Sequence, residues 1–116
     1  MRVLAAPDKF RGSLTALEAT SAIEKAVKKS GGSSIGVPLA DGGEGTLDVL
    51  GGPNRTTTVT GPLGAPVEAE WRLADRTAVI EVAKVSGLTL AGGPENNDPL
   101  EARTKGTGEL IRCALE

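Results

Sequence analysis

The sequence contains no histidine, and this absence removes several classes of enzyme at once. A Ser-His-Asp or Cys-His nucleophile, an HExxH zinc site and an imidazole base all require histidine. Cys113 is the single cysteine, so the chain has no internal disulfide, and a thiolate zinc site would need ligands from elsewhere. We therefore expect a reducing, cytoplasmic compartment.

Aromatic residues and charge of one sign are also scarce. Phe10 and Trp71 are the only aromatic side chains, which excludes the base-stacking platforms of single-strand binders. The 13 basic and 15 acidic residues leave a net charge of −2 without a long run of either sign. This balance argues against nucleic-acid partners and membrane surfaces. The apolar run before Pro7 is far shorter than the roughly 20 residues of a membrane span, so the sequence predicts a soluble protein.

The chain has 116 residues, which allows one domain or an incomplete piece of a larger protein. Its first fifty residues predict a β-α-β-α order. Val3–Ala6 is a short apolar run typical of a buried strand, and the capping box Thr15-x-x-Glu18 starts a helix. A second strand is expected at Ile35–Leu39, followed by a Gly-rich turn and a short helix around Leu47.

From residue 55 the apolar period changes from helical to alternating. A strand at residues 56–60 and a strand with one apolar face at 67–73 predict a hairpin, and Thr77–Val82 predicts a third strand. Residues 92–99 read as an irregular loop, and Thr107–Leu115 resumes helical spacing. We expect three segments: 1–52, part of an α/β domain; 53–95, β-rich; and 96–116, a loop and helix.

The first motif is Asp8-Lys9-Phe10-Arg11-Gly12-Ser13, in the loop between the first strand and the first helix. Ligands of α/β proteins usually bind at this edge of the sheet. Lys9 and Arg11 are candidates to hold a carboxylate or a phosphate, and Asp8 is a candidate to bind a metal or a hydroxyl. Ser13 adds a hydroxyl, although solvated loop charges would explain the same residues.

The second motif is Asp41-Gly42-Gly43-Glu44-Gly45-Thr46. Its glycines can expose backbone N–H groups to an anion, and its carboxylates suit Mg²⁺ or a substrate hydroxyl. It is neither a Walker A motif nor GxGxxG. The alternative is a tight turn in which Asp41 caps the next helix.

Four other positions have structural alternatives to a functional role. Thr107, in Arg103-Thr104-Lys105-Gly106-Thr107-Gly108, is a candidate phosphate contact, but Thr107 or Gly108 could equally cap the last helix. Glu81 lies in an apolar run where an unpaired carboxylate would be costly, so it has a buried structural partner or a catalytic role. Cys113 and Trp71 are expected in the core.

Five motifs in collinear order resemble the opening of the bacterial glycerate kinase family that includes the glycerate 2-kinases. APDKFRGSLTA is similar to an APDSFKGSL-type motif, and PLADGGEGT is the family signature almost unaltered. TGPLGAPVEAEW, AVIEVAKVSGL and NDPLEARTKGTGELI resemble the segments that follow, so the resemblance covers essentially the whole chain. Lys9 and Arg11 stand where a Ser or Lys and a Lys are common, and Arg103 and Lys105 stand near positions that are often small or aromatic.

The resemblance implies a Rossmann-like α/β domain joined to a smaller swivelling β/β/α domain, of which this chain is the N-terminal part. It implies ATP-dependent phosphorylation of D-glycerate to phosphoglycerate, with 2-phosphoglycerate favoured, and Mg²⁺ as cofactor. The expected partners are this substrate and the nucleotide; the oligomeric state stays open. Family members are longer and continue into a GGSATNDGG-type segment, so we expect the 116-residue chain alone to be inactive.

Mapped onto this sequence, the resemblance assigns catalytic roles to Asp41, Asp8 and Lys9. Binding of substrate or phosphate falls to residues with cationic, hydroxyl or backbone donors, namely Arg11, Ser13, Gly42, Gly43, Gly45, Thr46 and Thr107. Asp41 and Glu44 are the expected Mg²⁺ ligands. Two alternatives stay open: a catalytically incomplete fragment that serves as a binding or structural module, and a sugar-acid binder that does not transfer phosphate.

Overall fold

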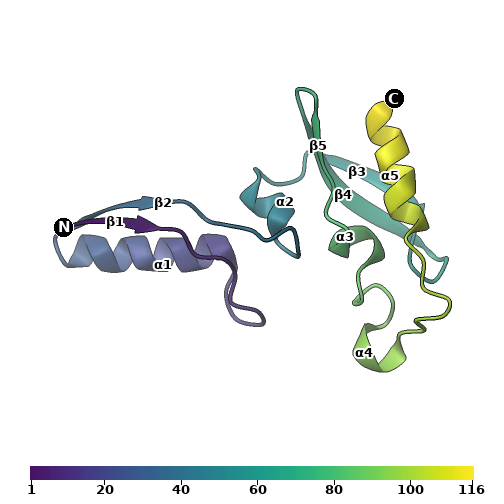
Figure 1. Ribbon diagram of the computed structural model, residues 1–116, viewed down its shortest axis with the longest axis horizontal. Coiled ribbons are helices and arrows are strands. Elements are labelled where there is room, and N and C mark those ends of the chain that lie inside the picture. The colour runs from purple at the N-terminus through teal and green to yellow at the C-terminus, as the bar shows by residue number, and fades with distance from the viewer. The chain divides into compact units, whose positions relative to one another are not determined.

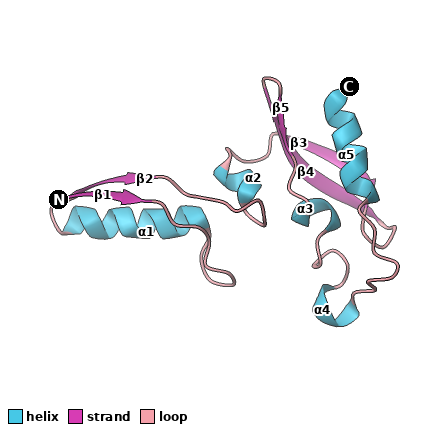
Figure 2. Cartoon of the chain, in the orientation of Figure 1, coloured by secondary structure: helices cyan, strands magenta, loops and turns pink.

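The computed structural model describes residues 1–116 and shows a mixed α/β chain (Figures 1 and 2). It divides into two compact units, Met1–Val49 and Leu50–Glu116. The division falls three residues before the boundary expected after residue 52, and the segment 96–116 belongs to the second unit.

The first unit is a β-α-β arrangement followed by a short helix. It contains β1 (Arg2–Ala5), α1 (Ala16–Lys29), β2 (Ser33–Gly36) and α2 (Thr46–Val49), and β1 pairs with β2 in parallel. Helix α1 runs alongside both strands (Figure 1), and the side chains buried between them are Ala5 of β1 and Ala16, Ala19 and Val27 of α1. The predicted order of elements is confirmed.

The capping box at the start of α1 is also confirmed. The Thr15 hydroxyl accepts a hydrogen bond from the Glu18 N–H at 3.2 Å, and the Thr15 N–H donates to the Glu18 carboxylate at 2.8 Å. The bond from the Thr15 backbone lowers the pKa of Glu18 below its ordinary value. Two otherwise unpaired N–H groups are thus satisfied, which explains why the helix begins here.

The face of the β1–β2 sheet that points away from α1 is apolar and open. Leu4 and Ile35 are register partners on this face and are 68% and 57% exposed. The ladder continues past β2, since the Val37 N–H donates to the Ala5 carbonyl at 2.8 Å. Val37 lies two residues beyond Ile35 and extends the same face. The strand predicted at residues 35–39 therefore begins two residues earlier, at Ser33, and is assigned only to Gly36. Its hydrogen bonding to β1 nevertheless continues at Val37.

The second unit is an antiparallel sheet in the order β3-β4-β5, and two of the unit's three helices, the first and the last, pack against the sheet. Its strands are β3 (Arg55–Thr60), β4 (Pro66–Ala74) and β5 (Thr77–Val79), and its helices are α3 (Ala83–Ser86), α4 (Gly93–Asn96) and α5 (Lys105–Leu115). The predicted alternation is confirmed, because the core consists of inward residues of the sheet and residues of α3 and α5: Val59, Ala69, Trp71, Val85 and Leu110.

Trp71 lies at the centre of this core and is 2% exposed. Its indole N–H donates to the Thr57 hydroxyl at 3.0 Å, and the Arg55 guanidinium lies 5.9 Å from the ring centroid. Cys113 packs against the same cluster. The core position predicted for Trp71 is confirmed, whereas Cys113 is partly buried at the margin of the core.

The strand predicted at Thr77–Val82 is too long. β5 ends at Val79, opposite Arg72, and the chain turns directly into α3. The reason is local: the Glu81 carbonyl accepts the Lys84 N–H at 3.0 Å, so the backbone at this point already forms a helical turn. Glu81 is therefore not a strand residue, and its side chain is buried at 2% exposure.

Two helical boundaries also differ from expectation. The segment 92–99 contains the one-turn helix α4, because Pro94 occupies its first turn, where the missing N–H costs nothing. Helix α5 begins at Lys105, with Thr104 as N-cap and no side-chain capping bond. Neither Thr107 nor Gly108 caps it. None of the helices combines the length and the apolarity that a membrane crossing requires.

Candidate functional site

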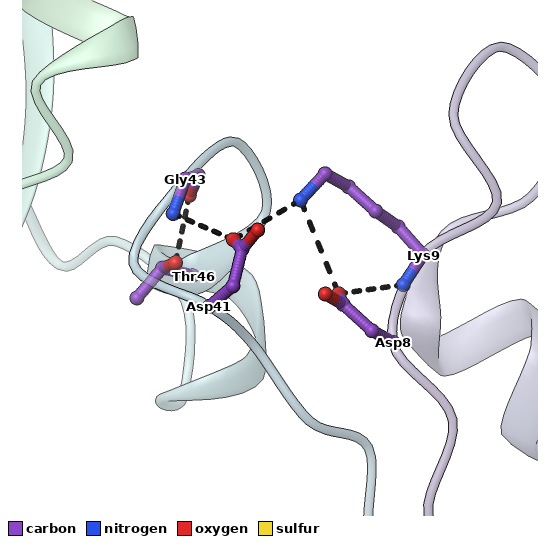
Figure 3. A network of polar contacts seen from close by, with 5 residues as sticks. All are labelled: Asp8, Lys9, Asp41, Gly43 and Thr46. Carbon is purple, nitrogen blue, oxygen red and sulfur yellow. Dashed lines mark hydrogen bonds and ion pairs between the residues drawn. The ribbon is translucent and has the colours of Figure 1, made fainter.

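Five of the predicted site residues of the first unit, Asp8, Lys9, Asp41, Gly43 and Thr46, form one network at the loops that follow the two strands. Asp8 and Lys9 follow β1, and Asp41 to Thr46 lie between β2 and α2. Because the carboxyl ends of parallel strands lie at the same edge of a sheet, residues 32 positions apart come into contact. Figure 3 shows the resulting polar network of Asp8, Lys9, Asp41, Gly43 and Thr46.

Lys9 links the two loops. Its Nζ lies 3.3 Å from Asp41 Oδ1 and 4.0 Å from Asp8 Oδ1 (Figure 3). The Lys9 side chain is 19% exposed, whereas that of Asp41 is 65% exposed. Asp8 Oδ1 also accepts the backbone N–H of Lys9 at 2.6 Å. A shielded ammonium therefore lies between two carboxylates.

The Asp41 carboxylate also has a hydrogen-bond partner in its own loop. Its Oδ1 accepts the Gly43 N–H at 2.9 Å, and the Thr46 hydroxyl donates to the Gly43 carbonyl at 2.7 Å. The bond from Gly43 and, next, the contact with Lys9 hold the pKa of Asp41 below its ordinary value. Asp41 is thus an ionised acceptor at neutral pH. It is not the N-cap of α2, which begins only at Thr46.

The glycines of this loop serve two geometric needs. Gly42 and Gly45 both have φ of 91°, a left-handed conformation that favours glycine. At Gly43 the limit is space, because a Cβ there would lie 2.9 Å from Asp41 Oδ1. The loop that presents Asp41 therefore requires glycine at separate positions for separate reasons.

Arg11 and Ser13 lie in a tight turn between β1 and α1. The Phe10 N–H donates to the Leu14 carbonyl at 2.8 Å, and the Ser13 hydroxyl donates to the Phe10 carbonyl at 3.2 Å. Ser13 thus serves the turn itself in this structure. The Arg11 side chain is exposed and forms no ion pair, so its guanidinium is the cation of this loop that is available to a ligand.

The acidic residues do not form a cluster that could coordinate a metal ion. The chain nowhere brings together three or more Asp, Glu, Cys or His side chains in a group that could hold a metal ion. Glu44 is exposed, and the charged neighbour of Asp41 is the ammonium of Lys9. As they stand, Asp41 and Glu44 therefore do not fit a protein-held Mg²⁺ site.

Thr107, the remaining predicted site residue, belongs to the second unit. Its hydroxyl lies 3.0 Å from the hydroxyl of Ser86, the last residue of α3. Ser86 was not among the predicted site residues. The one sequence feature that could have pointed to it is its hydroxyl directly before Gly87 in the motif AKVSGL. Glu109 was also missed: its carboxylate accepts hydrogen bonds from the backbone and the hydroxyl of Thr60, at 2.7 and 2.9 Å.

Comparison with known proteins gives one consistent result. The model of the glycerate kinase family matches residues 3–116. Glycerate 2-kinase of Escherichia coli K12 is 44% identical and glycerate kinase of Bacillus subtilis 168 is 47% identical, over 100% of this chain and 32% of either relative. A crystal structure assigned to glycerate kinase 2 of Salmonella typhimurium LT2 superposes with a TM-score of 0.80 at 42% identity, over 99% of this chain and 33% of that one.

The chain thus spans about a third of the length of the curated relatives that it matches. The expected resemblance to their N-terminal portion is confirmed, and with the family model covering nearly every residue, the chain belongs to the glycerate kinase family.

Proposed function

We propose that the full-length protein containing this chain transfers the γ-phosphoryl group of ATP to the 2-hydroxyl of D-glycerate, giving 2-phosphoglycerate. The observation that carries this proposal is the Lys9–Asp41–Gly43 network at the carboxyl edge of the sheet, in a chain that belongs to the glycerate kinase family. We assign the reaction to the cytoplasm, with Mg²⁺ arriving on the nucleotide.

Phosphoryl transfer requires positioning and charge stabilisation rather than covalent help from the protein. Asp41 supplies an ionised oxygen that accepts a hydrogen bond from the substrate hydroxyl and so directs it toward the phosphate. Because Lys9 and Gly43 already hold this carboxylate in place, it does not have to reorganise when glycerate binds.

The glycerate carboxylate needs a cation at a fixed distance from its hydroxyl. Arg11 is suited to this role because its planar guanidinium can pair with a carboxylate in a bidentate manner. It is exposed and forms no ion pair within the protein. Ser13 and Thr46 supply hydroxyls to substrate or phosphate, and Gly42 and Gly45 allow close approach of the backbone. In the second unit, Thr107 offers a further hydroxyl to phosphate. Asp8 adds negative charge beside the ammonium of Lys9, and Glu44 adds an exposed carboxylate to the glycine-rich loop.

The test is the product made by the full-length protein. Incubation with D-glycerate and Mg-ATP, followed by ³¹P NMR, should show 2-phosphoglycerate, and Asp41→Asn should lower kcat by about a hundredfold or more. The matched control is Asp48→Asn, the same change at an exposed position of α2. The proposal falls if ATP is not consumed with glycerate, and its regiochemistry falls if the product is 3-phosphoglycerate.

The two alternatives give different results in the same experiments. A catalytically incomplete module would bind glycerate as the 116-residue chain and turn it over only at full length. A sugar-acid binder that transfers no phosphate would bind glycerate at full length with an affinity independent of ATP and Mg²⁺. Calorimetric titration of both lengths with glycerate, with and without nucleotide, separates these outcomes.

A further inference from the structure

The ammonium of Lys9 lies where a cation is electrostatically required. Asp8 and Asp41 come from two different loops and both direct an Oδ1 atom at Lys9 Nζ, at 4.0 and 3.3 Å (Figure 3). Two carboxylates brought this close repel each other unless a positive charge lies between them. Lys9 supplies that charge from within the chain.

This role suits lysine, and Lys9 is well placed for it. An ammonium is a compact point charge with three donors, comparable in its function to a small bound cation. The Lys9 side chain is largely shielded at 19% exposure, so water weakens its ion pairs less than those of a surface lysine. Arg11, the other cation of the loop, forms no ion pair and stays available to a ligand.

The ion pair also extends into the glycine loop. Asp41 Oδ1 accepts both Lys9 Nζ and the Gly43 N–H, and the Gly43 carbonyl in turn accepts the Thr46 hydroxyl. A chain of contacts therefore connects the ammonium to the first residue of α2. Loss of the ammonium would free Asp41 from the neighbouring loop and leave the Gly43 contact as its remaining support.

We propose that Lys9 is a positioning residue that takes the place of a protein-bound divalent cation between Asp8 and Asp41 and holds the loop 41–46 in its binding conformation without metal. This inference rests on the proposed function in assigning Asp41 to the substrate hydroxyl. Its consequence is specific: Lys9 and a divalent cation compete for the same two carboxylates, and Arg11 rather than Lys9 binds the substrate anion.

The first experiment measures metal binding and needs no activity. Mn²⁺ is titrated into the full-length protein, and paramagnetic broadening of the Gly43 amide is followed by NMR. Lys9→Met removes the charge and keeps an apolar stem, and it should tighten Mn²⁺ binding by about tenfold. Lys9→Arg should bind Mn²⁺ as weakly as the wild type, and Lys25→Met, at an exposed position of α1, is the matched control.

The second measurement uses hydrogen exchange of the Gly43 amide in the same samples. In the wild type its rate should be the same in chelator and in millimolar Mg²⁺. In Lys9→Met it should be about tenfold faster in chelator and should slow when Mg²⁺ is added. Equal Mn²⁺ affinities in wild type and Lys9→Met, or an exchange rate unchanged by the variant, would overturn the proposal.

Kinetics of the full-length protein separate positioning from substrate binding. Lys9→Met should lower kcat about tenfold with little change in the KM for glycerate, Lys9→Arg should restore most of the loss, and Arg11→Met should raise KM. A raised KM with normal kcat in Lys9→Met would make Lys9 a substrate ligand and refute the inference. If the protein does not phosphorylate glycerate at all, the proposed function fails, while the Mn²⁺ and exchange measurements still decide the role of Lys9.

Discussion

Glu109 and Thr60 join helix α5 to the end of strand β3 across 49 residues of sequence. The two carboxylate oxygens accept separate bonds, from the Thr60 N–H at 2.7 Å and from the Thr60 hydroxyl at 2.9 Å. Lys105 Nζ lies 3.6 Å from the same carboxylate, one helical turn earlier. Thr60 is the last residue of β3, an edge strand of the sheet, and its N–H donates to the helix residue Glu109.

The first prediction concerns the pH dependence of this contact. The Thr60 N–H, and then the Thr60 hydroxyl, hold the pKa of Glu109 below its ordinary value of 4.5. A depressed pKa contributes stability that is present above the ordinary pKa and is lost as the pH falls through the lowered one. Glu109→Gln should therefore be less stable than wild type at pH 7, and the difference should shrink below pH 4.5.

Urea unfolding at a series of pH values measures this difference. Glu95→Gln, at an exposed position of α4, is the control and should follow the wild type throughout. A difference between Glu109→Gln and wild type that stays constant from pH 7 to pH 3 would show that the charge of Glu109 does not stabilise the fold.

The second prediction compares two glycines of helix α5. A Cβ on Gly106 would lie 2.1 Å from the Thr60 carbonyl oxygen and 3.1 Å from a methyl group of Val59, whereas a Cβ on Gly108 would meet nothing within 4 Å. Gly106→Ala should destabilise by about 1–3 kcal/mol because helix and strand must separate. Gly108→Ala should stabilise by about 0.5–1 kcal/mol, the usual gain inside a helix.

Both values come from chemical denaturation monitored by far-ultraviolet circular dichroism. The pair forms its own control, since the substitution and the helix are the same and only the neighbouring atoms differ. Equal effects of the two substitutions would contradict the close approach of α5 to β3.

The third prediction concerns the buried indole. Thr57→Val keeps the shape of the side chain but removes the acceptor of the Trp71 N–H, and the loss should be about 1–3 kcal/mol because a buried donor is left unsatisfied. Trp71 fluorescence reports the unfolding directly, since it is the only tryptophan. Thr56→Val, on the exposed face of the same strand, should change the stability by less than about 0.5 kcal/mol. Similar losses at both positions would indicate that the indole bond adds little.

The fourth prediction concerns the loop that carries Asp41. Gly43→Ala places a Cβ 2.9 Å from Asp41 Oδ1, so the carboxylate must move, and kcat of the full-length protein should fall by about 10- to 100-fold. Gly108→Ala serves as the control for a glycine-to-alanine change outside this loop. Normal turnover in Gly43→Ala would show that the observed position of Asp41 is not needed.

Prediction from the sequence was correct where neighbours along the chain decide the local structure. The capping box of Thr15 and Glu18 marked the start of α1, and the alternation through Val67, Ala69 and Trp71 marked the buried face of β4. It failed at Glu81, because the residues around it are as apolar as those of a strand. The helical turn that begins at Glu81 ends β5 at Val79, although β4 continues beyond Arg72.

The candidate site divides in the same way. The composition of the two loops singled out the candidate residues, and the first loop was expected at the edge of the sheet where α/β proteins usually bind ligands. The sequence contained no sign that Lys9 pairs with Asp41 or that Glu109 bonds Thr60, because these contacts join residues 32 and 49 positions apart.

The sequence by itself determined most of the elements of this protein, its family and the types of side chain at its candidate site, because caps, turns and apolar periods act within a few residues. Only the tertiary structure decided which charged side chains form ion pairs. The parallel pairing of β1 with β2 brings Lys9 to Asp41 and leaves Arg11 exposed, and electrostatic energy depends on such distances in space rather than on separation along the chain.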